Sequence, residues 1–398
     1  MIERNSYISE LIDFKDKQLI KIITGIRRCG KSTLFDLYQD YLLETGIEPE
    51  QIISINLEDL EYSEIGDYKQ LYKHITGKMV RGKMNYIFLD EIQLIPEFQK
   101  TVNSLFIKKN CDVYITGSNA FLLSGEFATL LSGRYVEIKM LPLSFKEYVS
   151  CFKDNNNLER LYVKYISESS FPYALELKKE RDIRQYLDGI FNSIIIKDVI
   201  GRRKFPDIQM FQSVIRFMFD NIGNVTSMKR IADTMTSLGR KISINTVESY
   251  ISALCESFIL YKASRYDIKG CQYLQNGDKY YVADMGLRYF LLGNKNVDDG
   301  HILENVIYLE LLRRGYQVFV GKYGKVEVDF VATKGEDTEF YQVAYTVKDE
   351  ETLKRELAPL NSIKNHNPKF LLTMDIKPVT SHNGVKQINA LDWLLETE

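Results

Sequence analysis

Five short runs of mostly apolar residues alternate with helical patterns in the first 150 residues of the chain. The runs lie at 19–24, 51–56, 85–90, 111–116 and 134–140. Strands covered by helices on both faces are apolar throughout, and strands that alternate with helices form parallel sheets. The pattern therefore predicts one α/β domain over residues 1–150.

The pattern changes after residue 150, as expected for a chain of 398 residues, which is long for a single core. Residues 151–205 carry aliphatic side chains at helical spacing, which predicts a small helical lid. Residues 206–298 contain short helical patterns, a turn, and strand-like pieces at 258–263 and 279–283. This order is typical of a winged helix-turn-helix domain.

The last hundred residues, 299–398, predict a further α/β unit. Helical patterns at 301–314 and 350–365 are combined with strands near 316–320, 325–332, 338–345 and 369–373. No second phosphate-binding sequence occurs there.

Composition and charge narrow the possible partners. The formal net charge is −2, so the chain has no global positive field for nucleic acid or membrane. The segment 201–270 is locally basic, with eleven Lys and Arg residues against six acids. The helix expected to read bases, 246–257, has no Lys or Arg and contains Glu248 and Glu256. DNA binding and a packing or oligomerisation role for this domain both stay open.

Cysteine use and the charged amino-terminal residues predict a cytoplasmic protein. The five cysteines are scattered without the paired spacing of a metal site or disulfide framework, which indicates a reducing compartment. The first residues are too charged for a signal peptide, and no apolar segment approaches the roughly twenty residues that span a bilayer.

The sequence GIRRCGKST, at 25–33, follows the first strand pattern and opens a helical one. Glycines let backbone N–H groups turn inward, and the start of a helix attracts phosphate. Lysine adds a mobile cation, and serine a hydroxyl that ligates Mg²⁺. The predicted binding residues are Gly25, Arg28, Cys29, Gly30, Lys31, Ser32 and Thr33.

Two residues of this loop have open interpretations. The positive field could lower the pKa of the Cys29 thiol and make it sensitive to oxidation, or Cys29 could be a small filler. Arg28 could contact a neighbouring subunit or the lid, or be a solvated side chain.

Two carboxylates, Asp90 and Glu91, end the strand pattern at 85–90. Nucleotide-hydrolysing sheets need this arrangement. We predict that Asp90 holds Mg²⁺ through water and that Glu91 orients or deprotonates the attacking water.

Small polar residues and one arginine complete the candidate site. Ser118 and Asn119 follow the fourth strand pattern and could sense the γ-phosphate, or simply form a turn and a helix cap. Arg134 precedes the fifth strand and could reach phosphate in its own subunit or across a subunit boundary. The alternative for Arg134 is a surface ion pair.

With these residues in view, the chain resembles AAA+ ATPases of bacteria and archaea that carry an Arg-Arg pair in the phosphate loop. The resemblance rests on GxRRxGKST at 25–33, FLDEIQ at 88–93, TGSN at 116–119, SGRY at 132–135 with LPLSFKEY at 141–148, and EVDF with QVA near the end. It implies a parallel sheet in the order 5-1-4-3-2, the cofactors ATP and Mg²⁺, and a terminal domain of the restriction-endonuclease fold.

The resemblance also implies roles for several residues. Ser118 or Asn119 matches a first sensor, and Arg134 matches a phosphate-sensing arginine. If Arg134 acts across a subunit boundary, the protein works as a homo-oligomer. Arg202 and Arg203 are candidates for a second sensor. In the terminal domain, Glu304 and Asp329 match nuclease carboxylates, but Gln342 replaces a carboxylate and Ala344 a lysine. Neutral groups bind divalent metal weakly, so we expect a nuclease-inactive scaffold or docking domain.

Three functions follow. The first is an Mg²⁺-dependent ATPase whose nucleotide state moves the lid and winged helix and acts on DNA or a protein partner. The second is a DNA-binding regulator that binds ATP without appreciable turnover, against which the presence of Glu91 argues. The third is an ATP-regulated, metal-dependent nuclease. The choice of ATP over GTP as the nucleotide is inferred from the resemblance. The sequence itself does not exclude GTP, although no Asn-Lys-x-Asp sequence, which would bind guanine, follows the phosphate loop.

Overall fold

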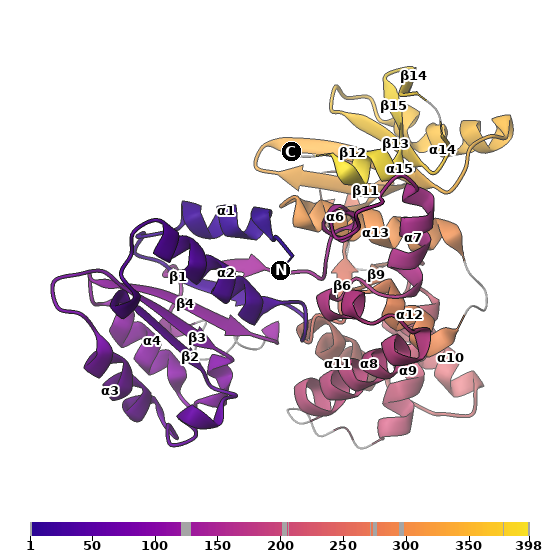
Figure 1. Ribbon diagram of the computed structural model, residues 1–398. Coiled ribbons are helices and arrows are strands. Elements are labelled where there is room, and N and C mark those ends of the chain that lie inside the picture. The colour runs from indigo at the N-terminus through magenta and orange to yellow at the C-terminus, as the bar shows by residue number, and fades with distance from the viewer. Residues whose placement is uncertain are drawn as a thin grey trace. The chain divides into compact units, whose positions relative to one another are not determined.

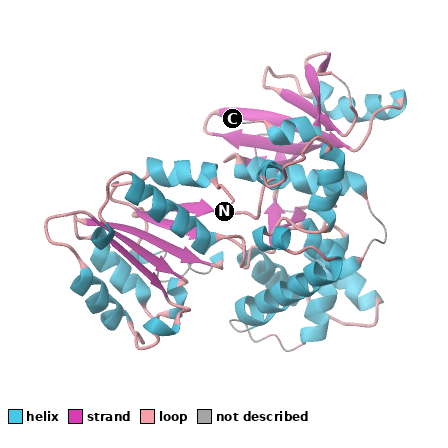
Figure 2. Cartoon of the chain, in the orientation of Figure 1, coloured by secondary structure: helices cyan, strands magenta, loops and turns pink. Residues whose placement is uncertain are grey.

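A computed structural model describes residues 2–120, 129–200, 205, 207–270, 272–273, 277–293, 298–376 and 378–396. The chain divides into two compact units. The first comprises Met1–Pro142 and Glu256–Phe258, and the second Leu143–Cys255 and Ile259–Glu398. Both units combine helices with strands (Figure 2).

The first unit is built on a five-stranded sheet in which every pair of neighbours is parallel. The sheet order is β2-β3-β4-β1-β5, which is the predicted order read from the other edge. All five predicted strands are confirmed within two residues at each end. They are β1 (Ile20–Thr24), β2 (Ile52–Asn56), β3 (Asn85–Asp90), β4 (Cys111–Gly117) and β5 (Tyr135–Lys139).

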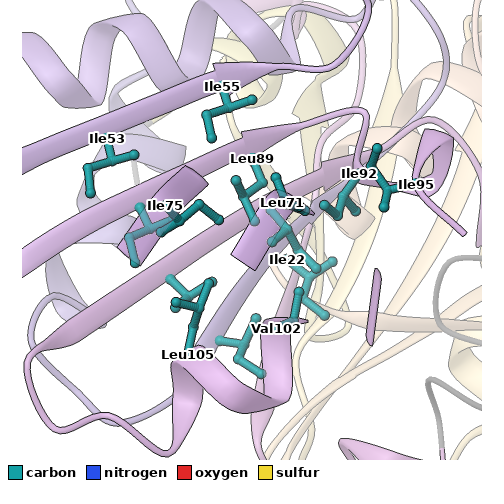
Figure 3. Packing of buried hydrophobic residues seen from close by; sticks show 14 of the residues in the cluster. Ile22, Ile53, Ile55, Leu71, Ile75, Leu89, Ile92, Ile95, Val102 and Leu105 are labelled. Carbon is teal, nitrogen blue, oxygen red and sulfur yellow. The ribbon is translucent and has the colours of Figure 1, made fainter. Parts of the chain in front are cut away.

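Helices cover both faces of this sheet (Figure 1). On one side lie α3 (Tyr68–Lys78) and α4 (Phe98–Phe106), whose apolar side chains pack against aliphatic residues of the strands (Figure 3). On the other side lie α1 (Asn5–Asp13) and α2 (Lys31–Glu44). Short 3₁₀ helices occupy Pro49–Gln51, Leu60–Tyr62 and Ile92–Leu94.

The two faces differ in chemistry because alternate strand residues point to opposite sides. In β3, Ile87 and Leu89 join the aliphatic cluster of α3 and α4. Phe88 instead meets Phe35 of α2, with ring centroids 5.1 Å apart. Tyr114 of β4 meets Tyr38 of α2 in the same way, at 5.3 Å.

The second unit begins with helices. They are α6 (Phe145–Ser150), α7 (Leu158–Ser167), a 3₁₀ helix (Pro172–Glu176), α8 (Glu180–Ser193), a π-helix (Ile194–Ile200), α9 (Ile208–Asp220), α10 (Met228–Ser237), α11 (Ile244–Glu256) and α12 (Met285–Leu292). The sequence pattern did not predict α12, which packs against α7, α8 and α9.

A buried carboxylate and a glycine fasten α12 to the preceding helices. Asp284 caps α12 by accepting the Leu287 N–H, and it also accepts the Ser170 N–H at 2.6 Å. A Cβ on Gly286 would lie 2.6 Å from the Glu168 carbonyl oxygen, so only glycine permits this approach. Residues 168–170 and the start of α12 are therefore tightly packed against one another.

The strands predicted at 258–263 and 279–283 form an antiparallel pair, β6 (Leu260–Ala263) and β9 (Lys279–Val282). Between them in the chain, β7 (Arg265–Asp267) and β8 (Gln272–Tyr273) join a larger sheet, in which β7 pairs with β10 (Gln317–Tyr323). Segments on both sides of the predicted boundary at 298 thus share a sheet. The assignment as a winged helix and the domain limits stay predictions.

The larger sheet has eight strands in the order β14-β15-β13-β12-β11-β10-β7-β8. Its remaining elements are α13 (Asp299–Arg313), β11 (Val326–Lys334), β12 (Asp337–Ala344), α14 (Glu350–Ser362), β13 (Lys369–Thr373), β14 (Thr380–His382), β15 (Val385–Asn389) and α15 (Ala390–Leu395). None of the described helices is long and apolar enough to cross a membrane.

Candidate nucleotide site and a second acidic site

The loop between β1 and α2 adopts backbone angles that require its glycines. Gly25 has φ of 152°, and a Cβ there would lie 2.1 Å from the Met140 carbonyl oxygen. Gly30 has φ of 104° and directly precedes the first residue of α2. Arg28 is also left-handed, with φ of 70°, and its side chain is exposed. These angles bend the chain sharply into the helix, as a phosphate-binding loop requires.

Lys31 and Ser32 occupy the first turn of α2. The Lys31 ammonium is buried and donates to the carbonyl oxygens of Gly25, at 3.0 Å, and Ile26, at 3.3 Å. Ser32 and Thr33 are exposed. The lysine therefore lies over the loop, where an anion held by the start of α2 would compete for it.

Cys29 is fully buried, and burial raises the pKa of its thiol. The neutral thiol is favoured, so the filler interpretation fits the structure and the oxidation-sensitive one does not. Its carbonyl oxygen accepts a hydrogen bond from Arg4 at 3.4 Å, and the same guanidinium donates to the Leu141 carbonyl oxygen at 2.7 Å. Arg4 thus joins the phosphate loop at Cys29 to the chain at Leu141. No local pattern in the sequence indicates this role.

A threonine connects the two carboxylates at the end of β3. The Thr116 hydroxyl donates to the Asp90 carboxylate and accepts the backbone N–H of Glu91 at 2.9 Å. Asp90, Glu91 and Thr116 are all buried. The link holds because Leu89 and Ile115 are partners in the parallel register of β3 and β4. The sequence pattern predicts the strand end at Thr116 but no role for its hydroxyl.

Gln93 completes the environment of Glu91. Glu91 has φ of 51°, which turns the chain at the strand end, and its carboxylate accepts a hydrogen bond from the Gln93 side-chain amide. The Gln93 Oε1 atom is buried without a hydrogen-bond partner in the described part of the chain. The Glu91 carboxylate thus lies next to a buried acceptor whose hydrogen-bonding capacity is not used within the described residues.

Ser118 and Asn119 are buried just beyond the end of β4. Gly117, which precedes them, pairs with Thr24 at the end of β1, immediately before the phosphate loop. Both residues therefore follow the strand that lies beside the loop. Their role as phosphate sensors stays a prediction.

Arg134 lies at the opposite edge of the sheet. Its carbonyl oxygen accepts the N–H of Ile20, which is the first residue of β1. The phosphate loop instead follows Thr24, the last residue of β1. A strand of this length separates the two by about 16 Å. The guanidinium donates to Asn103 at 2.5 Å and lies over the Phe106 ring. Because β5 runs parallel to β1, Arg134 lies at the end of the sheet opposite the phosphate loop of its own subunit. Its role as a phosphate-sensing arginine stays a prediction.

The candidate second-sensor residues Arg202 and Arg203 lie outside the described residues. The phosphate loop and the β3 and β4 ends thus comprise the described part of this site. The carboxyl ends of parallel strands meet at one edge of a sheet, where ligands of such folds bind.

A second acidic site lies in the terminal sheet. Glu304 of α13 is buried, and Asp329 of β11 is nearly so. The Lys279 ammonium of β9 lies 2.9 Å from Glu304 Oε1 and 3.6 Å from Asp329 Oδ1. These residues line a cavity of about 720 Å³ that also contacts Arg230. Among the described residues, no group of three or more His, Cys, Asp or Glu side chains is placed to hold a metal ion.

Gln342 and Ala344 also line this cavity. The Gln342 side-chain amide donates to Glu356 at 3.0 Å, and its oxygen accepts the Asp329 N–H at 3.4 Å. Gln342 is engaged as a neutral hydrogen-bonding group. Lys279, which sequence reasoning assigned only to a strand, supplies the positive charge.

Comparisons with known proteins bear on the family. The chain is 40% identical to an uncharacterized protein of Haemophilus influenzae, over 100% of this chain and 99% of that protein. It is 31% identical to the uncharacterized protein MJ1544 of Methanocaldococcus jannaschii, over 83% of this chain and 75% of that protein. Both relatives therefore share most of the two units.

Residues 17–149 match the family model described as AAA domain, and residues 159–298 match a domain of unknown function (DUF8612). Among solved structures, the Walker-type ATPase PABY2304 of Pyrococcus abyssi is similar in fold. The likeness has a TM-score of 0.50 at 15% identity and covers 73% of this chain and 96% of that one. Residues 17–149 therefore belong to the AAA family, and the first unit has the fold of a P-loop AAA+ ATPase.

For an AAA+ ATPase, ATP and Mg²⁺ are the implied ligands, and the donor set fits them. Lys31 and the start of α2 suit phosphate, while the exposed Ser32 hydroxyl and the Asp90 carboxylate are oxygen ligands of the kind Mg²⁺ takes.

Proposed function

We propose that this AAA+ protein binds ATP with Mg²⁺ and hydrolyses it. The observation that carries the proposal is the Thr116 hydroxyl, which bonds both the Asp90 carboxylate and the Glu91 backbone. It fixes a metal-binding carboxylate and a candidate base relative to one another. A site that only binds nucleotide has no need of a positioned base.

Each residue has a distinct part in this proposal. Lys31 releases the Gly25 and Ile26 carbonyl oxygens and binds the β- and γ-phosphates. Ser32 and Asp90 would hold Mg²⁺, which neutralises phosphate charge when bound. Glu91 accepts a proton from the attacking water.

Gln93 and Asn119 would orient the same water. The unpartnered Gln93 Oε1 is an acceptor for its second proton. Asn119 follows the strand beside the phosphate loop and would contact the γ-phosphate.

Arg134 acts across a subunit boundary in this proposal. Its position at the end of the sheet opposite its own phosphate loop supports contact with the loop of a second copy. Hydrolysis then requires a homo-oligomer, in which the arginine stabilises charge on the transferring phosphoryl group.

The output of the cycle is a change in the second unit that acts on DNA or on a protein partner. The α10–α11 segment supports a nucleic-acid partner through Lys229, Arg230, Arg240 and Lys241. The absence of Lys and Arg from α11 favours backbone contact over base reading.

Steady-state ATP hydrolysis by the wild type and Glu91→Gln tests the proposal. The assay includes duplex DNA, single-stranded DNA or neither, at low and at moderate salt, because phosphate contacts weaken with salt. Glu91-dependent hydrolysis stimulated by DNA supports a nucleic-acid-coupled ATPase, and the same hydrolysis indifferent to DNA indicates a protein partner. Binding of ATP without turnover would overturn hydrolysis and favour a switch.

A further inference from the structure

The positive charge in the second acidic site comes from the protein itself. The Lys279 Nζ atom lies 2.9 Å from Glu304, 3.2 Å from Glu327 and 3.6 Å from Asp329. The lysine side chain is only 5% exposed. Tyr281 also donates to Glu304, at 2.6 Å. Three carboxylates from α13 and β11 therefore converge on one buried ammonium.

A second cation, Arg265 of β7, also binds this cluster of three carboxylates. Its guanidinium bonds the other oxygen of Glu327 at 3.0 Å. Three carboxylates thus face two fixed cations, so most of their charge is balanced within the chain. Lys279 remains protonated, because the three carboxylates outweigh burial and hold its pKa above the ordinary value.

This geometry does not fit the divalent cation that the restriction-endonuclease resemblance implies. Mg²⁺ needs oxygen ligands at about 2.1 Å in a near-octahedral shell. The lysine holds the carboxylate oxygens at 2.9 to 3.6 Å, and the ammonium stands between them. Gln342, at a position where such nucleases carry a carboxylate, instead pairs with Glu356.

We propose that the Lys279 ammonium permanently occupies the cation position of the Glu304, Glu327 and Asp329 cluster, so that the terminal sheet is a metal-independent module. The lysine then joins β9 to α13 and β11, where a nuclease would use a removable ion. Removing the ammonium leaves three adjacent buried or half-buried carboxylates, which a divalent cation would stabilise.

The test measures thermal unfolding with and without MnCl₂ at pH 8, in the absence of nucleotide, for the wild type, Lys279→Ala and Lys262→Ala. Lys262 is the matched control, because it lies in the paired strand β6 and bonds Asp278 at the surface. We expect Mn²⁺ to leave the melting temperatures of wild type and control unchanged. Lys279→Ala should melt about 10 °C lower, and Mn²⁺ should recover about half of that loss.

A folded Lys279→Ala protein that Mn²⁺ does not stabilise would overturn the proposal, since the cluster would then not be a cation site. If that variant does not fold, the proposal is tested by comparing Mn²⁺ binding to the wild type with Mn²⁺ binding to Asp329→Asn. Electron paramagnetic resonance that detects no Asp329-dependent Mn²⁺ in the wild type supports the internal cation. Mn²⁺ binding or DNA cleavage that is lost in Asp329→Asn contradicts it.

Discussion

Both units of this chain contain a buried lysine and buried carboxylates, and the two lysines, Lys31 and Lys279, are engaged differently. In the first unit, Lys31 binds the carbonyl oxygens of its own loop, while Asp90 and Glu91 are held by Thr116 and Gln93. In the second, Lys279 binds the carboxylates directly. Lysine bound to neutral carbonyls can be released to an anion. Lysine bound to carboxylates has already satisfied the charge that a metal would bring.

The two sites also differ in how far their side chains are exposed. Ser32 beside Lys31 is exposed, whereas the Lys279 side chain is only 5% exposed and its ammonium is bound by three carboxylates. An acidic pair at a strand end therefore indicates a metal site only when no cation from the same chain occupies it.

Removing the base of the first site should have the largest effect. Glu91→Gln keeps shape and hydrogen bonding but cannot accept a proton, so we expect hydrolysis to fall about 10⁴-fold. ATP affinity should stay within about threefold of the wild type. Phosphate release and equilibrium binding measure the two quantities. Glu97→Gln, at an exposed glutamate, is the control, and equal losses in both variants would refute the role of Glu91.

Arg134→Ala should lower hydrolysis about 10³-fold if the arginine acts on a neighbouring subunit. The wild-type rate per subunit should also rise with protein concentration, which dilution kinetics with mass measurement can follow. Arg81→Ala, at an exposed arginine, should change neither quantity. A strictly monomeric mass with a concentration-independent rate would rule out action between subunits.

The second site should make stability depend on pH. Burial and the Glu304 carboxylate raise the pKa of Asp329 to about 7, from an ordinary 3.8. Between these two pKa values the Asp329 carboxyl is protonated in the folded state and ionised in the unfolded state. Protonation of Asp329 therefore contributes fully to the free energy of unfolding at low pH, and this contribution is lost as the pH rises through 7.

We expect the free energy of unfolding to fall by on the order of 3 kcal/mol between pH 5 and 8 from this group. Denaturant titration of wild type and Asp329→Asn at both pH values isolates the contribution. The variant should lack this part of the decline, and identical slopes would show that Asp329 is ionised throughout.

Thr116→Val tests the link between Asp90 and Glu91. The isosteric change leaves the buried Glu91 N–H and one Asp90 oxygen without their partner, so we expect hydrolysis to fall about 10-fold with little loss of ATP affinity. Thr116→Ser retains the hydroxyl and should restore most of the rate. Failure of serine to rescue would mean that the methyl group, not the hydroxyl, matters.

Gln93→Leu should have the smallest effect, a decrease of about threefold in hydrolysis, because Glu91 loses one orienting hydrogen bond but keeps its proton-accepting carboxylate. Single-turnover hydrolysis with saturating ATP measures the step. An unchanged rate would limit the role of Gln93 to holding the resting conformation.

The sequence predicted much of the first unit and little of the second acidic site. The five strands, the phosphate loop and the β3 carboxylates are local patterns, and the order of the strands followed from the resemblance. The sequence could have indicated that Thr116 lies on the same face of the sheet as Asp90. Strict alternation in β3 and β4 places both residues, with Phe88 and Tyr114, on the face opposite the aliphatic cluster. Choosing Thr116 over Ser118 required the register, which a single sequence does not contain.

The position of Arg134 and the role of Lys279 depended on tertiary structure. The sequence placed Arg134 before a strand, but only the parallel pairing of β1 and β5 shows which edge it occupies. Lys279 lies far from Glu304 and Asp329 along the chain, on a strand of a different sheet. Nothing local distinguishes its side chain from any other strand lysine.

The most direct measurement counts bound Mn²⁺ per chain after gel filtration of Glu91→Gln, once with ATP and once without. One open site and one internally balanced site predict a single ion per chain with ATP and none above background without it. Mn²⁺ that stays bound without nucleotide and disappears on Asp329→Asn would contradict the contrast between the two sites.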